Sequence, residues 1–115
     1  FNWRAVAHLD PVDRSHPLFE EMNEVLHSFI AGENGLVDVH DLRAEGEAVP
    51  YRISFDLVTD METARSEYNE IYQRSLVTLK QAFGNRVSHA EIGIEAAVES
   101  APMARQLFEL PVEEV

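Results

Sequence analysis

The sequence of 115 residues contains no cysteine, and this absence removes a whole group of possible sites. Disulfide bonds, zinc sites built from thiolates and a cysteine nucleophile are all excluded. No apolar run approaches the roughly 20 residues needed to cross a bilayer, so we expect this part of the protein to be soluble. The chain begins with Phe1 and shows no signal-peptide pattern, so we expect a segment of a longer protein. A membrane-anchored parent and a free-standing soluble protein are both compatible with the sequence.

Basic residues are few: 9 Lys and Arg stand against 21 Asp and Glu, giving a net charge of −12. Nucleic-acid affinity comes mostly from Lys and Arg that neutralise phosphates, so this balance argues against a nucleic-acid partner. Direct binding to an anionic membrane surface is disfavoured for the same reason. Positively charged partners, metal ions included, fit better, although an acidic surface also serves simply to keep a domain soluble.

Motifs typical of enzymes are also missing from the sequence. None of the five glycines belongs to a G-x-G-x-x-G or P-loop pattern, so no phosphate-cradling loop is predicted. There is no G-x-S-x-G elbow, so Ser54, His40 and Asp56 are not predicted to form a catalytic triad. We therefore expect a protein that is not an enzyme.

Two segments have the apolar spacing of amphipathic helices. In the first, apolar residues from Leu18 to Ile30 repeat at helical spacing, and glycines at 32 and 35 end the pattern. The second is predicted to start at the Thr59-x-x-Glu62 capping box and to end at Gly84.

Three segments are predicted to be strands. They cover Leu36–Arg43, the residues after Pro50, where Tyr51 to Leu57 alternate apolar and polar side chains, and His89–Glu95. Residues 100–109 are expected to form a last short helix, followed by an acidic tail.

The resulting order, α-β-β-α-β, predicts a single α+β domain with two layers. Each helix has one apolar stripe, so both helices are expected on one face of a three-stranded sheet. The other face, which carries Arg52, Ser54 and Asp56, is then open to a partner or an ion. We divide the chain into an N-terminal arm (1–16), the domain itself (17–96), and a C-terminal short helix with an acidic tail (97–115).

The most informative motif is His40-Asp41-Leu42-Arg43, which closes a β-branched run and places an imidazole beside a carboxylate at a strand end. Together with the order of elements over residues 18–96, this motif resembles the cytosolic C-terminal domain of cation diffusion facilitator (cation efflux) metal transporters. The resemblance implies a ferredoxin-like, metallochaperone-like fold and a V-shaped homodimer on the cytosolic face of a membrane transporter. It further implies that the domain binds divalent cations and regulates transport through the transmembrane domain of the same protein.

The resemblance also suggests candidate metal ligands. His40 coincides with a frequent cation ligand of the family, Asp56 and Glu95 stand where many members have histidines, and His89 lies near the last of these. Zn²⁺, Fe²⁺ and Mn²⁺ are all compatible with such a set of nitrogen and oxygen donors. For each residue the alternative is a structural role, either a hydrogen-bonded surface or interface histidine or a solvated carboxylate.

The sequence therefore predicts a dimeric cytoplasmic regulatory domain in which a divalent cation between the protomers favours a closed dimer. Two alternatives share the same fold. One is a dimerisation module that needs no metal, and the other is a free-standing soluble protein.

Overall fold

The computed structural model describes residues 15–60, 62–97 and 104–110. Within these ranges the chain forms two α-helices and four β-strands, which confirms the predicted α+β class. The bounds are α2 Phe19–Ala31, β1 Leu36–Glu45, β2 Tyr51–Thr59, α3 Tyr68–Phe83, β3 Val87–Ala96 and β4 Ala104–Glu109, with short 3₁₀ turns η1 (Arg65–Glu67) and η2 (Gly84–Arg86). No helix in these ranges is long and apolar enough to span a membrane.

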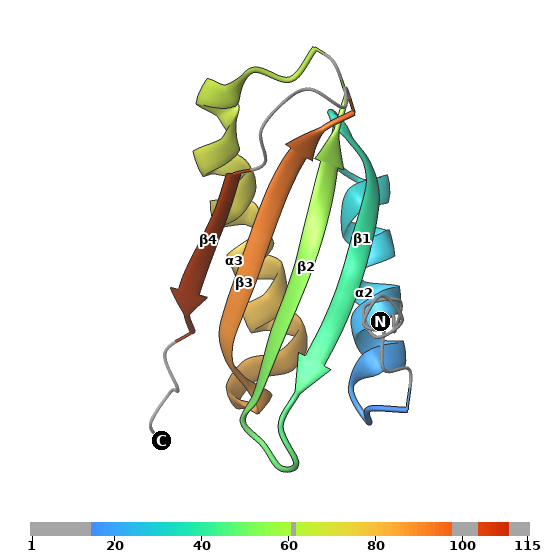
Figure 1. Ribbon diagram of the computed structural model, residues 1–115, viewed down its shortest axis with the longest axis vertical. Helices are drawn as coiled ribbons and strands as arrows, with labels where there is room; N and C mark the ends of the chain where they lie inside the picture. The colour runs from blue at the N-terminus through green and yellow to red at the C-terminus, as the bar shows by residue number, and fades with distance from the viewer. Residues whose placement is uncertain (1–14, 61, 98–103, 111–115) are drawn as a thin grey trace, which may run out of the picture.

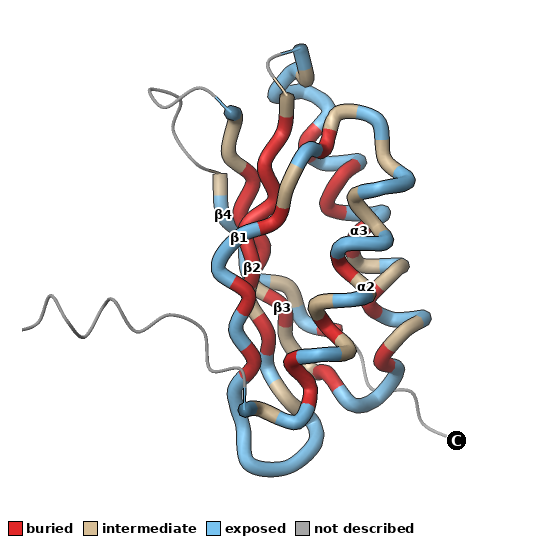
Figure 2. Tube along the Cα trace, turned by 90° about the vertical axis from the view of Figure 1, so that its right-hand side faces the viewer, coloured by how far each residue is buried: buried red, intermediate tan, exposed pale blue. Residues whose placement is uncertain are grey.

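The four strands form one mixed sheet in the order β1-β2-β3-β4 (Figure 1). β1 pairs with β2 and β3 pairs with β4 in antiparallel fashion, whereas the two central strands, β2 and β3, are parallel. Parallel neighbours need a crossover connection, and α3 provides it. Both helices lie on the same side of the sheet, so neither covers its other face (Figure 2).

A single apolar core fills the space between the helices and the sheet. Ile53, Phe55 and Leu57 alternate along β2 and are at most 3% exposed, as the sequence period of two predicts. Ile92 and Ile94 of β3 are fully buried beside them. The helices contribute the buried apolar side chains Phe19, Met22, Leu26, Tyr68, Ile71, Tyr72, Leu79 and Phe83.

The predicted start of the second helix is wrong. Thr59 is the last residue of β2 and is fully buried, and its hydroxyl donates to the carbonyl of Glu95 at 3.4 Å instead of capping a helix. The turn after β2 is organised by Asp60, whose carboxylate accepts hydrogen bonds from the Glu62 N–H (3.1 Å) and the Thr63 hydroxyl (2.7 Å). The helix α3 therefore begins at Tyr68, after the 3₁₀ turn η1.

The predicted short helix at residues 100–109 is also wrong, because Ala104–Glu109 forms β4. β4 supplies backbone partners to the second edge of β3, so the sheet has four strands and not the expected three. Tyr72 of α3 fixes the strand from the helical side: its hydroxyl donates to the Ala104 carbonyl at 3.2 Å, and its ring lies 5.2 Å from that of Phe108. Tertiary contacts thus override a weak local preference.

Two other predicted segments lie wholly or mostly outside the described residues. Only Ser15 and His16 of the expected N-terminal arm (1–16) are described, and the expected acidic tail (111–115) is not. His16 accepts a hydrogen bond from the Leu18 N–H at 3.0 Å, directly before α2, through its Nδ1 atom.

Candidate functional site on the open face of the sheet

The face of the sheet turned away from the helices carries almost only polar and charged side chains. Side chains alternate along a strand. The residues that precede and follow the buried ones of β2 and β3 in sequence therefore have their side chains on this face. We call it the open face; across the register of the four strands it comprises Asp38, His40, Arg43, Glu45, Arg52, Ser54, Asp56, Val58, His89, Glu91, Gly93, Glu95, Arg105, Leu107 and Glu109.

A β-bulge lies inside the His40–Arg43 motif. His40 pairs with Asp56 and Arg43 pairs with Ser54, so two residues of β1 stand opposite the single residue Phe55 of β2. Asp41 occupies the bulge with φ of 57°, a left-handed conformation that Asp tolerates better than most residues. The bulge leaves His40 on the open face and Leu42 in the core, where it is buried.

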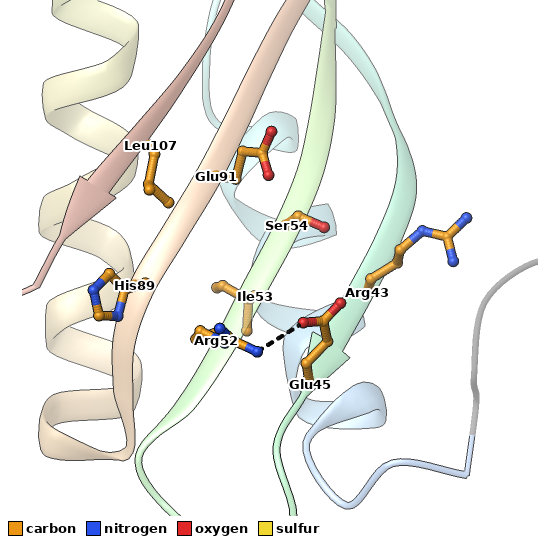
Figure 3. Close-up of a pocket in the computed structure, with 8 residues that line it drawn as sticks. All are labelled: Arg43, Glu45, Arg52, Ile53, Ser54, His89, Glu91 and Leu107. Carbon is orange, nitrogen blue, oxygen red and sulfur yellow. Dashed lines mark hydrogen bonds and ion pairs between the residues drawn. The ribbon is translucent and has the colours of Figure 1, made fainter.

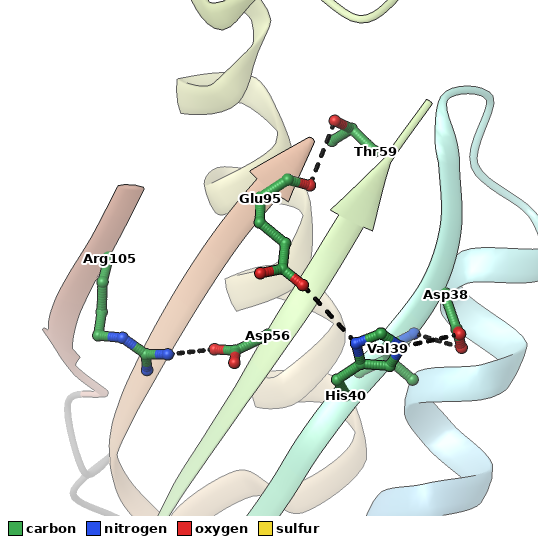
Figure 4. Close-up of polar contacts among 7 residues, drawn as sticks. All are labelled: Asp38, Val39, His40, Asp56, Thr59, Glu95 and Arg105. Carbon is green, nitrogen blue, oxygen red and sulfur yellow. Dashed lines mark hydrogen bonds and ion pairs between the residues drawn. The ribbon is translucent and has the colours of Figure 1, made fainter. Parts of the chain in front are cut away.

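His40 lies between two carboxylates (Figure 4). Its Nε2 atom is 3.0 Å from Asp38 Oδ2 on the same strand, and its Nδ1 atom is 3.6 Å from Glu95 Oε2 on β3. The side chains of His40 and Asp38 are about half exposed, so the group is accessible from solvent. We call these residues the Asp38–His40–Glu95 cluster.

The Asp38 carboxylate is held in place by one further hydrogen bond. It accepts the Val39 N–H at 2.8 Å, and this bond together with the contact to His40 lowers the pKa of Asp38. The cluster therefore places one carboxyl group on each side of the His40 ring.

Asp56 occupies the centre of the open face and is in a different environment. Its side chain is only 4% exposed and pairs with the Arg105 guanidinium of β4 (Figure 4). Burial and a hydrogen bond shared with Asp41 raise the pKa of Asp56 to about 6, against the opposing effect of Arg105. The carboxyl groups of Asp56 and Asp41 thus meet the guanidinium of Arg105. With a pKa of about 6, Asp56 takes up or releases its proton near pH 6.

His89 lies apart from the cluster, at the other end of β3. It is six positions from Glu95 (95 − 89), or about 20 Å along the strand. His89 lines a hollow of about 370 Å³ that also contains Arg43, Glu45, Arg52 and Glu91 (Figure 3). Its Nδ1 atom lies 2.9 Å from the Ser88 hydroxyl, and Arg52 in the same hollow donates to Glu45 at 3.2 Å.

Of the four predicted metal ligands, the structure brings together His40 and Glu95. Asp56 is the strand partner of His40, but its carboxylate faces Arg105, and His89 is too distant to share an ion with them in one chain. Over the described ranges, no three His, Cys, Asp or Glu side chains are arranged to hold one metal ion.

Two residues of this candidate site, Asp38 and Arg105, were not predicted from the sequence. Asp38 lies two positions before His40, and positions i and i+2 of a strand share a face. The predicted strand and the candidate ligand His40 were therefore enough to indicate Asp38. Arg105 had no comparable signal, since it belongs to the segment that was expected to be helical.

Comparison of the chain with family models, with curated proteins and with solved structures found no match.

Proposed function

We propose that this chain is a non-enzymatic regulatory domain of a divalent-cation transporter, on the cytoplasmic side of the membrane. In this proposal a cation (Zn²⁺, Fe²⁺ or Mn²⁺) bound between two copies favours a closed dimer. The change from the open to the closed dimer then regulates the transmembrane domain. The ferredoxin-like, metallochaperone-like character implied by the resemblance to cation diffusion facilitators is part of the same proposal. The observation that carries it is the accessible imidazole of His40 between two carboxylates, on a sheet face that neither α2 nor α3 covers.

The geometry of the cluster favours a site shared by two chains. Asp38 and Glu95 approach different nitrogens of the His40 ring, so one ion bound to one of these nitrogens meets only one of the two carboxylates. A single chain then offers two ligands, whereas zinc sites in proteins are almost always four-coordinate. A second copy, related by a two-fold axis, supplies the same pair of ligands and completes the set.

Electrostatics provide the driving force for cation-dependent closure. Two chains together carry a formal charge of −24 (2 × −12), so their acidic faces repel each other when no cation is bound. This repulsion is weak per pair, about 0.4 kcal/mol for unit charges 10 Å apart in water, but it acts over many pairs. A bound dication cancels carboxylate charge and adds ligand bonds in the closed form only, and it therefore shifts the population toward that form.

Isothermal titration calorimetry tests this function directly. We expect Zn²⁺, Fe²⁺ or Mn²⁺ to bind the wild type, and His40→Ala to weaken binding by at least about tenfold because one ligand of each pair is lost. His27→Ala is the matched control, because its ring lies on α2, where Nδ1 donates to the Asn23 carbonyl at 2.9 Å.

The competing function, a dimerisation module that needs no metal, gives the opposite result. In that case the wild type and His40→Ala show the same weak heats with every cation, and small-angle scattering shows a dimer of the same shape with cation and with chelator. That outcome contradicts the proposed cation site.

A further inference from the structure

The hollow on the open face has no part in the proposed cation function. Its volume is about 370 Å³, which is within the range of small-molecule sites (Figure 3). We propose that this hollow binds a free amino acid with an apolar side chain, in its zwitterionic form. The inference does not depend on the proposed cation function, because it uses no residue of the Asp38–His40–Glu95 cluster.

The hollow forms because a short side chain stands among long ones. Ser54 pairs with Arg43 of β1 on one side and with Glu91 of β3 on the other. Arg52 lies two positions before Ser54 on the same strand and therefore on the same face. The longer side chains rise around the serine, so the surface is depressed at its centre.

Two rows of cross-strand neighbours give the hollow a basic end and an acidic end. Arg52 stands beside His89 in the first row, and Ser54 stands beside Glu91 in the second. Residues two positions apart along a strand are about 7 Å apart. In an α-amino acid the carboxylate and the ammonium group are attached to one carbon atom, and a hydrogen bond at each end adds about 3 Å. The zwitterion therefore spans the distance between the two rows.

The basic end has hydrogen-bond donors for a ligand carboxylate. Arg52 donates to Glu45 at 3.2 Å through one Nη atom, and a guanidinium has five N–H donors in all. His89 contacts the Ser88 hydroxyl through Nδ1 at 2.9 Å, whereas its Nε2 atom has no polar contact within the described ranges. When the Ser88 hydroxyl donates to Nδ1, the ring proton is on Nε2, which can then donate to a carboxylate. Hydrogen bonds of this kind, between a cation and a carboxylate, are the strong ones.

The other end has acceptors for an ammonium group and an apolar wall. Glu91 Oε2 lies 3.5 Å from Arg105 Nη1, and the Glu91 side chain is 45% exposed. A carboxylate has about four acceptor positions, so Glu91 can bind an ammonium group and keep its contact with Arg105. The Ser54 hydroxyl makes no side-chain hydrogen bond in the part of the chain that the structure describes. Leu107, which pairs with Glu91 across β3 and β4 and is 66% exposed, offers a surface to an apolar ligand side chain.

The charges of the chain favour a ligand without net charge. The formal charge of the whole chain is −12, so an anionic ligand is repelled as it approaches. The hollow itself is lined by two arginines and two glutamates, whose formal charges sum to zero. A purely cationic ligand meets the two arginines, and a purely anionic one meets the two glutamates. A zwitterion can place each of its charges beside a partner of opposite sign.

Isothermal titration calorimetry in the presence of chelator tests the site with three matched probes. L-leucine carries both charges, 4-methylpentanoate is the same molecule without its amino group, and 3-methylbutylamine is the same molecule without its carboxyl group. We expect L-leucine to bind with a Kd on the order of 0.1 mM, and each of the other two to bind at least about tenfold more weakly.

Substitutions at the two ends should change the affinities in different ways. In Arg52→Gln the carboxylate loses its partner, so L-leucine should bind about tenfold more weakly and nearly as 3-methylbutylamine does. In Glu91→Gln the ammonium group loses its partner, so L-leucine should bind nearly as 4-methylpentanoate does. Arg74→Gln is the matched control, because Arg74 is also paired with a glutamate, at 2.8 Å, but lies on α3. Ser54→Leu fills the hollow and should abolish binding, with circular dichroism to confirm the fold.

Three results overturn the proposal: no heat with L-leucine at millimolar concentration, equal binding of the three probes by the wild type, or the same effect from Arg52→Gln and Arg74→Gln. His40→Ala should bind L-leucine as the wild type does. The amino-acid site and the cation site can therefore fail separately.

Discussion

The pH dependence of stability provides a sharp test of the environment assigned to Asp56. This carboxyl group has a pKa of about 6 in the folded chain, against an ordinary value of 3.8. Between these two values the folded state keeps a proton that the unfolded state has released. The contribution of Asp56 to the free energy of unfolding is therefore fully present below pH 3.8 and is lost as the pH rises to about 6.

The pKa difference sets an upper bound on the size of this effect. A rise from 3.8 to about 6 corresponds to about 3 kcal/mol, and coupling to Asp41 and Arg105 makes this a maximum. Asp56→Asn has no proton to lose, so its stability lacks this decline. We expect the free energy of unfolding of Asp56→Asn, relative to the wild type, to increase by up to about 3 kcal/mol between pH 4 and pH 7.

Urea denaturation of both proteins at a series of pH values measures this difference. The contributions of all carboxylates that the two proteins share cancel when their free energies of unfolding are subtracted. Asp38→Asn is the matched control on the same face. Because the pKa of Asp38 is lowered, its contribution is present at neutral pH and is lost as the pH falls through the folded value. The relative stability of Asp38→Asn should thus change in the opposite direction. Parallel pH profiles for the wild type and Asp56→Asn would refute the reasoning.

Two further substitutions test the fold. Gly35→Ala should destabilise the protein by about 1–3 kcal/mol, because φ is +94° and a Cβ would lie 2.6 Å from the Thr63 hydroxyl. Gly32→Ala, where the nearest atoms are 3.8 Å away, is the control, and equal losses in urea denaturation would contradict this account. Phe55→Ala should cost about 3–5 kcal/mol because Phe55 is fully buried in the centre of the sheet. Val77→Ala, at an exposed position, should stay within about 0.5 kcal/mol in the same urea denaturation assay.

The helices and the first three strands could be predicted because each carries its own periodic pattern. The apolar stripe from Leu18 to Ile30 corresponds to α2, and the alternation from Tyr51 to Leu57 corresponds to β2. These patterns reflect burial on one side, which is a local property of the sequence. The start of α3 was missed because Asp60, not Thr59, organises the turn, and the two residues make equally plausible caps in sequence.

β4 could not be recognised by the same reasoning. Leu107 and Phe108 are adjacent, so the six residues of this strand lack a clear period of two. What makes the segment a strand is the unpaired edge of β3, which becomes visible only when the sheet is assembled. The partner of Asp56 was missed for the same reason, because Arg105 reaches it only from β4.

The candidate site was predicted in part. The resemblance placed His40 and Glu95 at one site, and in the structure the two side chains lie 3.6 Å apart. The resemblance also suggested His89. That residue lies far from the cluster, because a strand rises about 3.3 Å per residue and six positions of β3 separate His89 from Glu95.

The bulge at Asp41 has a consequence for how the strand tolerates changes of length. Removing that single residue would let Leu42 stand alone opposite Phe55, and every other residue of β1 would keep its present face. The fold therefore does not need the extra residue for its alternation. The extra residue places the Asp41 carboxyl group beside Asp56, so deleting it would remove that acidic group while the rest of β1 keeps its pairing with β2.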